Sequence, residues 1–305
     1  MTPRAVRATA PGKINLSLAV GRCDERGYHP LATVFHAVGL LETVTASRST
    51  GTELSLAIEG EGTSDLPADS TNLALRAAEA LRSHTGFNGG AHLHVHKTVP
   101  VAGGMGGGSA DAAATLVALN ELWELGLGRD DLTDIAATLG ADVPFSLRGH
   151  TALGTRYGDV LSPVMTRGSW HWVLALPGGG LSTPTVYRAF DDLMGRAGEQ
   201  APESPVTDAR VLTALLAGNP AELGPVLSND LQPAAFSLAP DVERVVDAAK
   251  RAGALGVVVS GSGPTVAALV ADAHHALDVE IALLASGYVR TCHRVVGNVP
   301  GARLI

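Results

Sequence analysis

The chain of 305 residues is long enough for two domains of ordinary size, and its 46% hydrophobic and 17% charged residues indicate a soluble globular protein. The formal net charge of −8 argues against a general nucleic-acid binder and against a protein that coats anionic membranes. Any recognition of phosphate must therefore be local.

The cysteine content and the first residues give an expectation for the compartment. Cys23 and Cys292 are the only cysteines, too few for a disulfide framework and without the spacing of a metal-thiolate site. The start, Met-Thr-Pro-Arg-Ala-Val-Arg, lacks the apolar run of a signal peptide, and no stretch reaches about 18 uninterrupted apolar residues. We expect a cytoplasmic protein without nucleic-acid or membrane partners.

The first predicted strand, within 6–20, carries a polar row. After the Pro11-Gly12 break, Lys13, Asn15 and Ser17 alternate with apolar residues, which places the three on one face of a strand. Taken alone, such a row is more often a solvated edge than a site. The polar turn 21–30 follows and carries Tyr28 and His29, which either complete local packing or hold a polar ring.

Strands are next predicted over 31–41 and 53–59. A helix is predicted over 73–84, with start signals in Asp69-Ser-Thr-Asn72 and a stop at Gly86. The strand predicted over 91–99 carries three alternating histidines, at positions 92, 94 and 96. Three histidines on one face suggest zinc, but no fourth ligand accompanies them, and a solvated strand face is the favoured interpretation. We predict no metal-ligating residues.

The stretch Pro100-Val-Ala-Gly-Gly-Met-Gly-Gly-Gly-Ser-Ala-Asp111 contains five glycines and leads into an apolar helix predicted over 112–125. Glycines allow the backbone to approach a bulky anion, and the free N–H groups and dipole of a helix start attract one. Ser109 suits the N-cap position. The segment predicts a polyphosphate cradle, although a glycine cluster alone is as often a simple loop. It lacks the Gly-Lys-Ser/Thr of a P-loop and the setting of a Rossmann fold.

Asp142 lies in a tight connection after a helix predicted over 130–139, with Pro144 suited to the next helix start. An isolated aspartate before a proline is most often a turn or cap residue, and here it is also a candidate base. Strands predicted over 149–157 and 170–176 flank turn signals at 160–168, which divide the chain into domains 1–165 and 166–305.

The second half alternates helices and strands around another glycine turn. Helices are predicted over 184–194, 208–217, 240–252 and 276–286, with strands over 257–259 and 265–270 on either side of Ser260-Gly-Ser-Gly-Pro264. The polar stretch 195–205 is expected to be a mobile insertion.

Four segments together match the needs of phosphoryl transfer. Such a site requires backbone donors and a cation for a polyphosphate, a carboxylate to accept a hydroxyl proton, and close backbone access to the acceptor. The chain has a group of each type: the cation of Lys13, the backbone of the glycine loop, the carboxylate of Asp142 and the backbone of the 260–263 turn.

The same segments resemble those of the GHMP kinases. The 100–111 loop is similar to their ATP loop, with Met105 and Ala110 where leucine and a second serine are usual, and Ser260-Gly-Ser-Gly-Pro-Thr-Val resembles their C-terminal glycine motif. Ala10-Pro-Gly-Lys-Ile-Asn-Leu, Arg26-Gly-Tyr-His-Pro-Leu-Ala-Thr-Val-Phe and Gly140-Ala-Asp-Val-Pro-Phe resemble the branch that phosphorylates a cytidine diphosphate-linked methylerythritol on the methylerythritol phosphate route to isoprenoids.

The resemblance implies an α+β two-domain fold, with an N-terminal ribosomal-protein-S5-like domain that binds ATP and a C-terminal ferredoxin-like domain that binds substrate. It implies transfer from ATP, used as its Mg²⁺ complex, to a 2-hydroxyl, with Asp142 as base and Lys13 orienting it. The residues that align with ATP contacts are Asn72, Lys97, Pro100, Val101, Ala102, Gly103, Gly104, Met105, Gly106, Gly107, Gly108, Ser109 and Ala110. Those that align with substrate contacts are Asn15, Tyr28, His29, Thr183 and Tyr187.

Two alternatives stay open. One is a GHMP kinase for a simpler alcohol, of the homoserine or mevalonate type, against which the 27–29 and 140–142 matches argue. The other is a nucleotide-binding regulator without catalysis, which would need the cradle but not both Lys13 and Asp142. Monomer and homodimer are equally compatible with the sequence.

Overall fold

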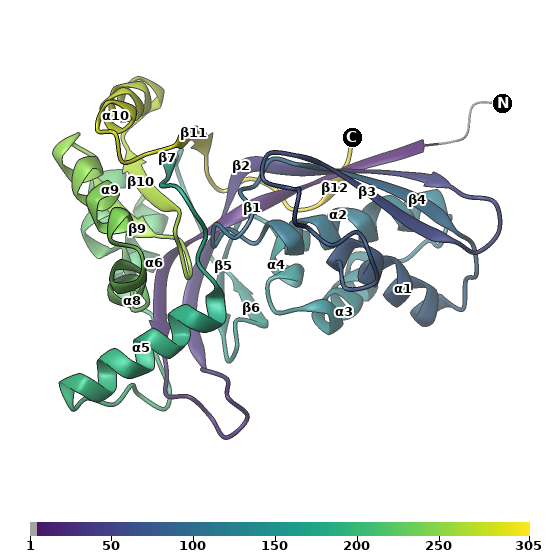
Figure 1. Cartoon of the computed structure of the whole chain (residues 1–305), viewed down its shortest axis with the longest axis horizontal. Coiled ribbons are helices and arrows are strands. Elements are labelled where there is room, and N and C mark those ends of the chain that lie inside the picture. The colour runs from purple at the N-terminus through teal and green to yellow at the C-terminus, as the bar shows by residue number, and fades with distance from the viewer. Residues whose placement is uncertain (1–4) are drawn as a thin grey trace.

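The computed structural model describes residues 5–305. Residues 1–4, on which part of the signal-peptide argument rests, lie outside the described residues. Two sheets with helices packed against them make up the molecule, and β1 (Ala5–Val20) and β2 (Leu31–Arg48) run through much of its length (Figure 1). None of the helices from residue 5 onward has the length and apolar character that a bilayer span requires.

The first sheet is mixed and has the strand order β12-β1-β2-β4-β3, with β5 on β2, β6 on β5 and β8 on β1. β1 and β2 pair antiparallel over almost their whole length, and irregularities at Pro11/Gly12 and Asn15/Ser17 break the register. The predicted interruption at Pro11-Gly12 is therefore a bulge inside one long strand, since a bulge accommodates a proline that cannot donate to the ladder. The other strands are β3 (Leu54–Gly60), β4 (Ala91–Lys97), β5 (Thr151–Thr155), β6 (Val160–Pro163), β8 (Ser228–Asn229) and β12 (Arg303–Leu304).

Four helices cover one face of this sheet: α1 (Leu73–Thr85), α2 (Gly107–Leu122), α3 (Arg129–Leu139) and α4 (Val143–Arg148). α1 begins at an Asn72 cap whose side chain accepts from the Ala74 N–H, and it ends at Gly86 in the left-handed region, as predicted. α2 is the central helix and is rich in alanine, so it lies close to its neighbours and buries ten residues. It starts at Gly107, five residues earlier than predicted.

The second sheet has the order β11-β7-β10-β9, and all of its strands are antiparallel neighbours. The strands are β7 (His171–Leu176), β9 (Gly256–Val259), β10 (Val266–Val270) and β11 (Thr291–Val296). In chain order this arrangement is 4-1-3-2, which with α9 and α10 gives the ferredoxin-like pattern. The predicted α+β fold of two units is confirmed.

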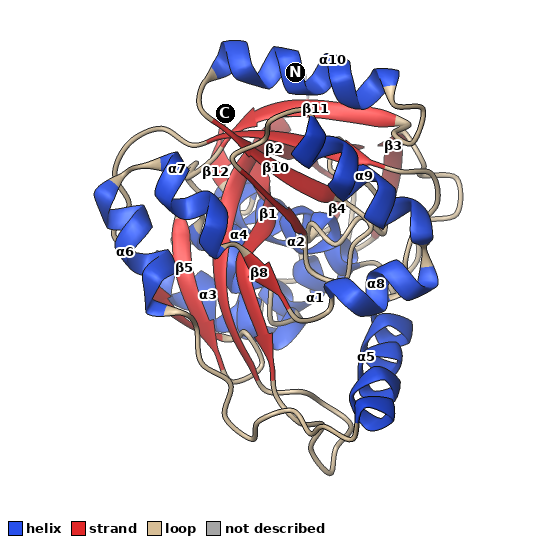
Figure 2. Ribbon diagram, turned by 90° about the vertical axis from the view of Figure 1, so that its left-hand side faces the viewer, coloured by secondary structure: helices blue, strands red, loops and turns tan. Residues whose placement is uncertain are grey.

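Helices of the second half surround this sheet (Figure 2). α9 (Pro240–Arg251) and α10 (Ala273–Ala285) contribute to its core, and α5 (Thr183–Ala197) lies apart from it, near the loop that joins β1 to β2. The remaining helices are α6 (Ala209–Ala217), α7 (Pro220–Leu223), the 3-10 turn η1 (Gly224–Val226) and α8 (Gln232–Leu238). The 195–205 stretch partly continues α5, and Ala201 is buried within it.

The two units share a core. Ile14 and Leu16 of β1 belong to one buried cluster with Trp170 and Trp172. Trp170 directly precedes β7, and Trp172 lies within it. The chain also crosses between the units after residue 165, because β8 and β12 both pair with β1.

Candidate active site

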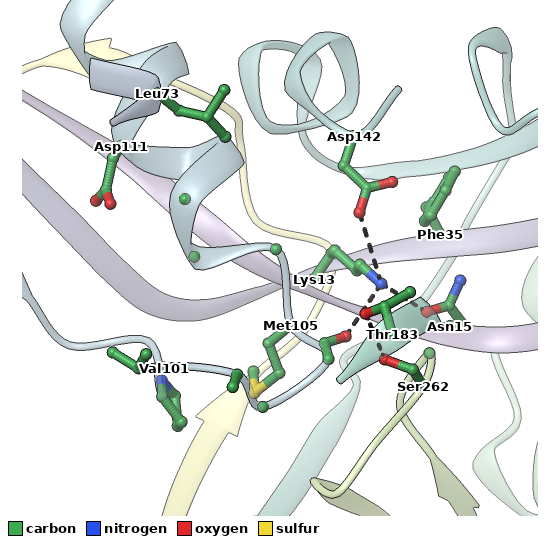
Figure 3. Close-up of a pocket in the computed structure, with 18 of the residues that line it drawn as sticks. Lys13, Asn15, Phe35, Leu73, Val101, Met105, Asp111, Asp142, Thr183 and Ser262 are labelled. Carbon is green, nitrogen blue, oxygen red and sulfur yellow. Dashed lines mark hydrogen bonds and ion pairs between the residues drawn. The ribbon is translucent and has the colours of Figure 1, made fainter. Parts of the chain in front are cut away.

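A cavity of about 470 Å³ lies where β1, the 100–106 loop, the start of α4 and the 260–263 turn meet. Figure 3 shows residues from all four segments around it. Segments that are far apart in the sequence thus converge on one site.

Lys13 is the central cation of the site. Its Nζ donates to Asn15 Oδ1 at 2.9 Å and to the Gly104 carbonyl at 3.0 Å, and it lies 5.7 Å from the centre of the Phe35 ring. The side chain is 7% exposed, so the polar row of β1 is buried rather than a solvated edge. Burial lowers the pKa of Lys13, while Asp142 opposes that shift.

Asp142 faces this ammonium from the start of α4. Its Oδ2 lies 3.9 Å from Lys13 Nζ, and the side chain is 33% exposed. It occupies the N-cap position, but the side chain makes no capping hydrogen bond, and Pro144 lies in the first turn as predicted. The carboxylate is therefore open to the cavity and held beside a cation.

The glycine loop leads into the N-terminus of α2. Gly106 is the N-cap, with φ 71°, so Ser109 lies in the first turn and the prediction that it caps the helix is wrong. The chain enters the helix earlier because glycine at 106 adopts the left-handed region at little cost. The free N–H groups of the first turn point toward the cavity end of the helix, where an anion is favoured.

The 260–263 turn packs directly against the glycine loop at Gly104. Gly104 has φ 74°, and a Cβ there would lie 2.2 Å from the Ser260 carbonyl oxygen and 2.9 Å from the Gly263 nitrogen. Ser260 Oγ also donates to the Gly104 carbonyl at 3.1 Å. The Ser262 and Thr183 hydroxyls lie 2.9 Å apart, which links this turn to α5.

Lys97 is not free to extend into the cavity, although it lines it. Its Nζ lies 2.5 Å from Glu42 Oε1 and 2.7 Å from Asp111 Oδ2, and all three side chains are at most 8% exposed. Burial, together with Asp111, raises the pKa of Glu42, and burial raises the pKa of Asp111. Sequence reasoning missed both carboxylates as site residues, although Asp111 ends the glycine motif and Glu42 is the one acid of the apolar run 31–46.

A second cavity, of about 420 Å³, adjoins the first at Thr183 and Tyr187 and contains Tyr28 and His29. The His29 and Tyr187 rings lie 5.0 Å apart and are tilted by 33°. Burial, then Asp142, raises the pKa of Tyr187. Tyr28 is 64% exposed and meets Tyr157 edge-on, so it does not stack on either ring.

Most of the other residues predicted to contact ATP line the cavity, and the last two lie in α2. Asn72 lines the cavity together with residues 100–108, but Ser109 and Ala110 do not, and Ala110 is fully buried in α2. The histidines of β4 lie on an exposed face, where His94 and His96 pair with Glu59 and His92 hydrogen-bonds Ser55.

The lining of the site fits the phosphates of a nucleoside triphosphate in chemistry. A Cβ at Gly107 would lie 3.1 Å from Glu42 Oε1 and 3.2 Å from Lys97 Nζ, and a Cβ at Gly106 would lie 3.3 Å from Lys13 Cγ. Only glycine leaves the backbone room to approach a ligand between these groups. For Mg²⁺, Asp142 offers a partly exposed carboxylate, whereas the buried Asp111 and Glu42 are already engaged by Lys97.

Comparisons with known proteins place the chain in a family. The family described as GHMP kinases N terminal domain matches residues 72–150, and GHMP kinases C terminal matches residues 211–289. The 4-diphosphocytidyl-2-C-methyl-D-erythritol kinase of Leifsonia xyli subsp. xyli is 51% identical over 99% of this chain and 99% of its own length. The protein of the same name from Mycolicibacterium gilvum is 50% identical over 99% of this chain and 93% of its own.

Solved structures agree in fold. A crystal structure of a 4-(cytidine 5'-diphospho)-2C-methyl-D-erythritol kinase is 32% identical, with a TM-score of 0.77, over 96% of this chain and 99% of that one. Homoserine kinase from Cytophaga hutchinsonii also gives a TM-score of 0.77, over 100% of this chain and 98% of that one. At 19% identity, this second similarity is evidence for the fold alone.

Proposed function

The chain belongs to the GHMP kinase family and is an ATP-dependent small-molecule kinase, and on this premise we propose its acceptor and its catalytic residues. The proposed reaction moves the γ-phosphoryl group of ATP to the 2-hydroxyl of 4-diphosphocytidyl-2-C-methyl-D-erythritol, on the route to isoprenoid precursors. The names of the relatives that are about 50% identical over nearly the whole chain support this acceptor.

The observation that carries the proposal is the pairing of Lys13 with Asp142 beside the N-terminus of α2. Lys13 Nζ lies 3.9 Å from Asp142 Oδ2 and 3.0 Å from the Gly104 carbonyl of the glycine loop. One cation therefore faces the candidate base and the candidate phosphate cradle together. A regulator that only binds nucleotide has no need of the carboxylate.

In the proposed mechanism, Asp142 accepts the proton of the 2-hydroxyl as its oxygen bonds to the γ-phosphorus and the bond to the ADP oxygen breaks. Lys13 pairs with the Asp142 carboxylate at 3.9 Å, and it also offsets negative charge on the phosphoryl group. Asn15 holds Lys13, and Asn15 is held in turn because its Nδ2 donates to Thr33 Oγ1 at 2.7 Å.

We assign the nucleotide cradle to the N-terminus of α2 and the loop before it. The N–H groups of the first turn would bind phosphate oxygens, with the helix dipole favouring the anion. Lys97 would not bind phosphate directly. It would support the loop through its ion pairs with Glu42 and Asp111. Mg²⁺, when bound with ATP, would neutralise phosphate charge, and the ATP oxygens and water would supply most of its ligands.

The cytidine end of the acceptor is proposed to enter the second cavity. His29 Nδ1 lies 2.8 Å from the Gly21 carbonyl, so this nitrogen carries the proton and Nε2 is left to accept a hydrogen bond, as from an exocyclic amino group. Tyr187 offers a ring face beside it, with Tyr28 and Thr183 at the rim of the cavity. This division assigns ATP binding to domain 1–165 and substrate binding to domain 166–305, with loop 21–30 reaching across.

The experiment that tests the function compares Asp142→Asn with wild type, using ATP and Mg²⁺ with the cytidyl substrate, homoserine or mevalonate. Removal of a general base costs roughly 10²–10⁴-fold in rate. We expect that loss in kcat, with ATP affinity by calorimetry unchanged. Asp134→Asn, at an exposed position of α3, is the matched control and should behave as wild type.

Each other outcome points to one alternative. Turnover of homoserine or mevalonate would keep the kinase and overturn the acceptor. ATP binding without transfer to any of the three alcohols would favour the regulator. A fully active Asp142→Asn variant would remove Asp142 as the base.

A further inference from the structure

Within residues 5–305, one group of three side chains offers metal-ligand atoms close together, at the edge of the second cavity. Cys23 and His29 lie in the loop between β1 and β2, and Asp191 lies on α5. The thiol sulfur, an imidazole nitrogen and a carboxylate oxygen all lie within 4.8 Å of one another. The proposed kinase mechanism uses neither Cys23 nor Asp191.

The spacing of these atoms fits a tetrahedral ion. His29 Nε2 and Asp191 Oδ2 are 3.4 Å apart, and two ligands about 2.1 Å from Zn²⁺ at a tetrahedral angle are separated by about 3.4 Å. The corresponding sulfur-to-nitrogen separation is about 3.6 Å, because Zn–S is about 2.3 Å. The Cys23 sulfur lies within 4.8 Å of both atoms, so it has to move by at most about 1.2 Å on binding.

The imidazole presents the nitrogen that a metal requires. His29 Nδ1 donates to the Gly21 carbonyl at 2.8 Å, so Nε2, which lies 3.4 Å from Asp191 Oδ2, is the ligand atom of the ring. The side chain of His29 is 6% exposed, so its orientation is fixed by packing. An ordered imidazole nitrogen beside a carboxylate is a preformed part of a metal site.

The charge around the thiol also favours a cation. The Asp191 and Asp24 carboxylates lie near the Cys23 thiol, and carboxylates attract a divalent ion. On binding, the thiol proton is released to solvent, and a thiolate, a carboxylate and a neutral imidazole balance the two charges of the ion.

We propose that Cys23, His29 and Asp191 form a binding site for Zn²⁺, with the fourth position open to the 420 Å³ cavity. The site stands on this geometry alone. Its consequence for catalysis rests on the proposed function: an ion on Nε2 removes the acceptor that the pyrimidine needs, so zinc and the cytidyl substrate exclude each other. Zinc is then a competitive inhibitor toward that substrate and not toward ATP.

Co²⁺ titration of the metal-free full-length protein, with a thiol-free reductant, tests the site directly. A tetrahedral thiolate site gives a sulfur-to-cobalt charge-transfer band and intense visible bands, which histidines on the β4 surface cannot produce. We expect one equivalent to bind in wild type and to be displaced by Zn²⁺. Cys23→Ser should lose the charge-transfer band, and Asp191→Asn should weaken binding about tenfold or more.

The chain supplies matched controls for both changes. Cys292→Ser removes the other thiol, whose pKa burial raises to about 12, and Asp192→Asn changes the neighbouring exposed carboxylate of α5. Both should titrate as wild type. No thiolate band in wild type, a band that survives in Cys23→Ser, or its loss in Cys292→Ser would overturn the site. If cobalt binds as expected but zinc leaves the KM of the cytidyl substrate unchanged, the site stands and the competition is refuted.

Discussion

Lys13 shows at the residue scale that this site is arranged for chemistry at some cost in stability. Burial lowers its pKa, so folding must overcome the desolvation of a charged ammonium. Its partner Asp142 is 33% exposed and would remain solvated if the lysine were removed. Activity and stability should therefore respond differently to its removal.

We predict that Lys13→Met lowers kcat by roughly 10²–10⁴-fold and leaves the free energy of unfolding within about 1 kcal/mol of wild type, or higher. No buried charge is stranded by the change, which distinguishes this pair from a fully buried one. Urea unfolding and steady-state kinetics on the same samples measure both quantities. Lys250→Met, at an exposed position of α9, is the control. A loss of several kcal/mol in Lys13→Met would mean that the lysine is mainly structural.

The buried triad of Glu42, Lys97 and Asp111 makes a prediction about pH. Burial, then Asp111, raises the pKa of Glu42 to about 7 from an ordinary 4.5, so the folded state binds this proton more tightly than the unfolded chain. That contribution to stability is complete below pH 4.5 and is lost as the pH rises through about 7. Glu42→Gln cannot titrate and should not show this loss.

The stability of Glu42→Gln relative to wild type should accordingly rise by roughly 1–3 kcal/mol between pH 5 and pH 8. Urea unfolding at four pH values measures this difference. The buried His36, whose pKa is lowered to about 3, titrates equally in both proteins and cancels. Glu199→Gln, on the surface, should give a flat difference, and a flat difference for Glu42→Gln as well would show that Glu42 is ionised throughout.

Some site residues could be predicted from the sequence and others could not. Lys13 and Asp142 stand in local patterns, an alternating strand and a tight helix start, so their chemistry shows in a few neighbouring letters. Glu42 becomes part of the site only because β2 lies beside β4 and under α2, which places Lys97 against it. No local pattern encodes such a contact.

At the scale of elements, the glycine loop and the 260–263 turn behave as one cradle because they meet at Gly104. We predict that Gly104→Ala lowers the free energy of unfolding by at least roughly 1–3 kcal/mol and raises the KM for ATP. The reason is the left-handed φ of 74° and a Cβ placed 2.2 Å from the Ser260 oxygen. Urea unfolding and ATP titration of the purified variant are the measurements.

Gly108→Ala is the matched control one turn later. Gly108 lies inside α2 without a positive φ, and its Cβ would meet Leu73 Cδ1 at an ordinary 3.4 Å. Alanine in a helix is favoured over glycine by up to about 1 kcal/mol, so stability should be equal or higher. Equal destabilisation by both changes would show that the meeting of the two turns is not what the loop requires.

Helices were predictable where the apolar periodicity extended over several turns and where capping residues marked the ends. α1 and α3 follow Asn72 and Gly128, α9 begins at Pro240, and all three lie within one or two residues of their predicted ranges. The short strands β6, β8 and β12 and the polar strand β11 were missed, since pairing partners rather than local preference stabilise them. The helices α7 and α8 were missed because they are too short to show a clear apolar period. α2 was predicted too short because glycines at 107 and 108 oppose helix when read alone.

Over the whole molecule, the long strands β1 and β2 join the two units into one packed body. Their residues Ile14, Leu16, Val34 and Val38 belong to the same cluster as Trp170, Trp172 and Leu269. The division near residue 165 that turn signals suggested does not reveal this shared core. Turns mark where a chain reverses, whereas cooperativity depends on which apolar faces meet.

We therefore predict that the protein unfolds as a single unit despite its two domains, because separating the sheets would expose the cluster around Trp170 and Trp172. Trp123→Phe leaves fluorescence that reports only this shared core, and the Trp170→Phe, Trp172→Phe double variant leaves Trp123, which reports the core of the first unit. Within each variant, urea transitions followed by fluorescence and by far-ultraviolet circular dichroism should coincide. Two separated transitions, with the Trp123 signal changing alone, would mean that the first sheet and its helices unfold independently and that the cleft can open without melting either half.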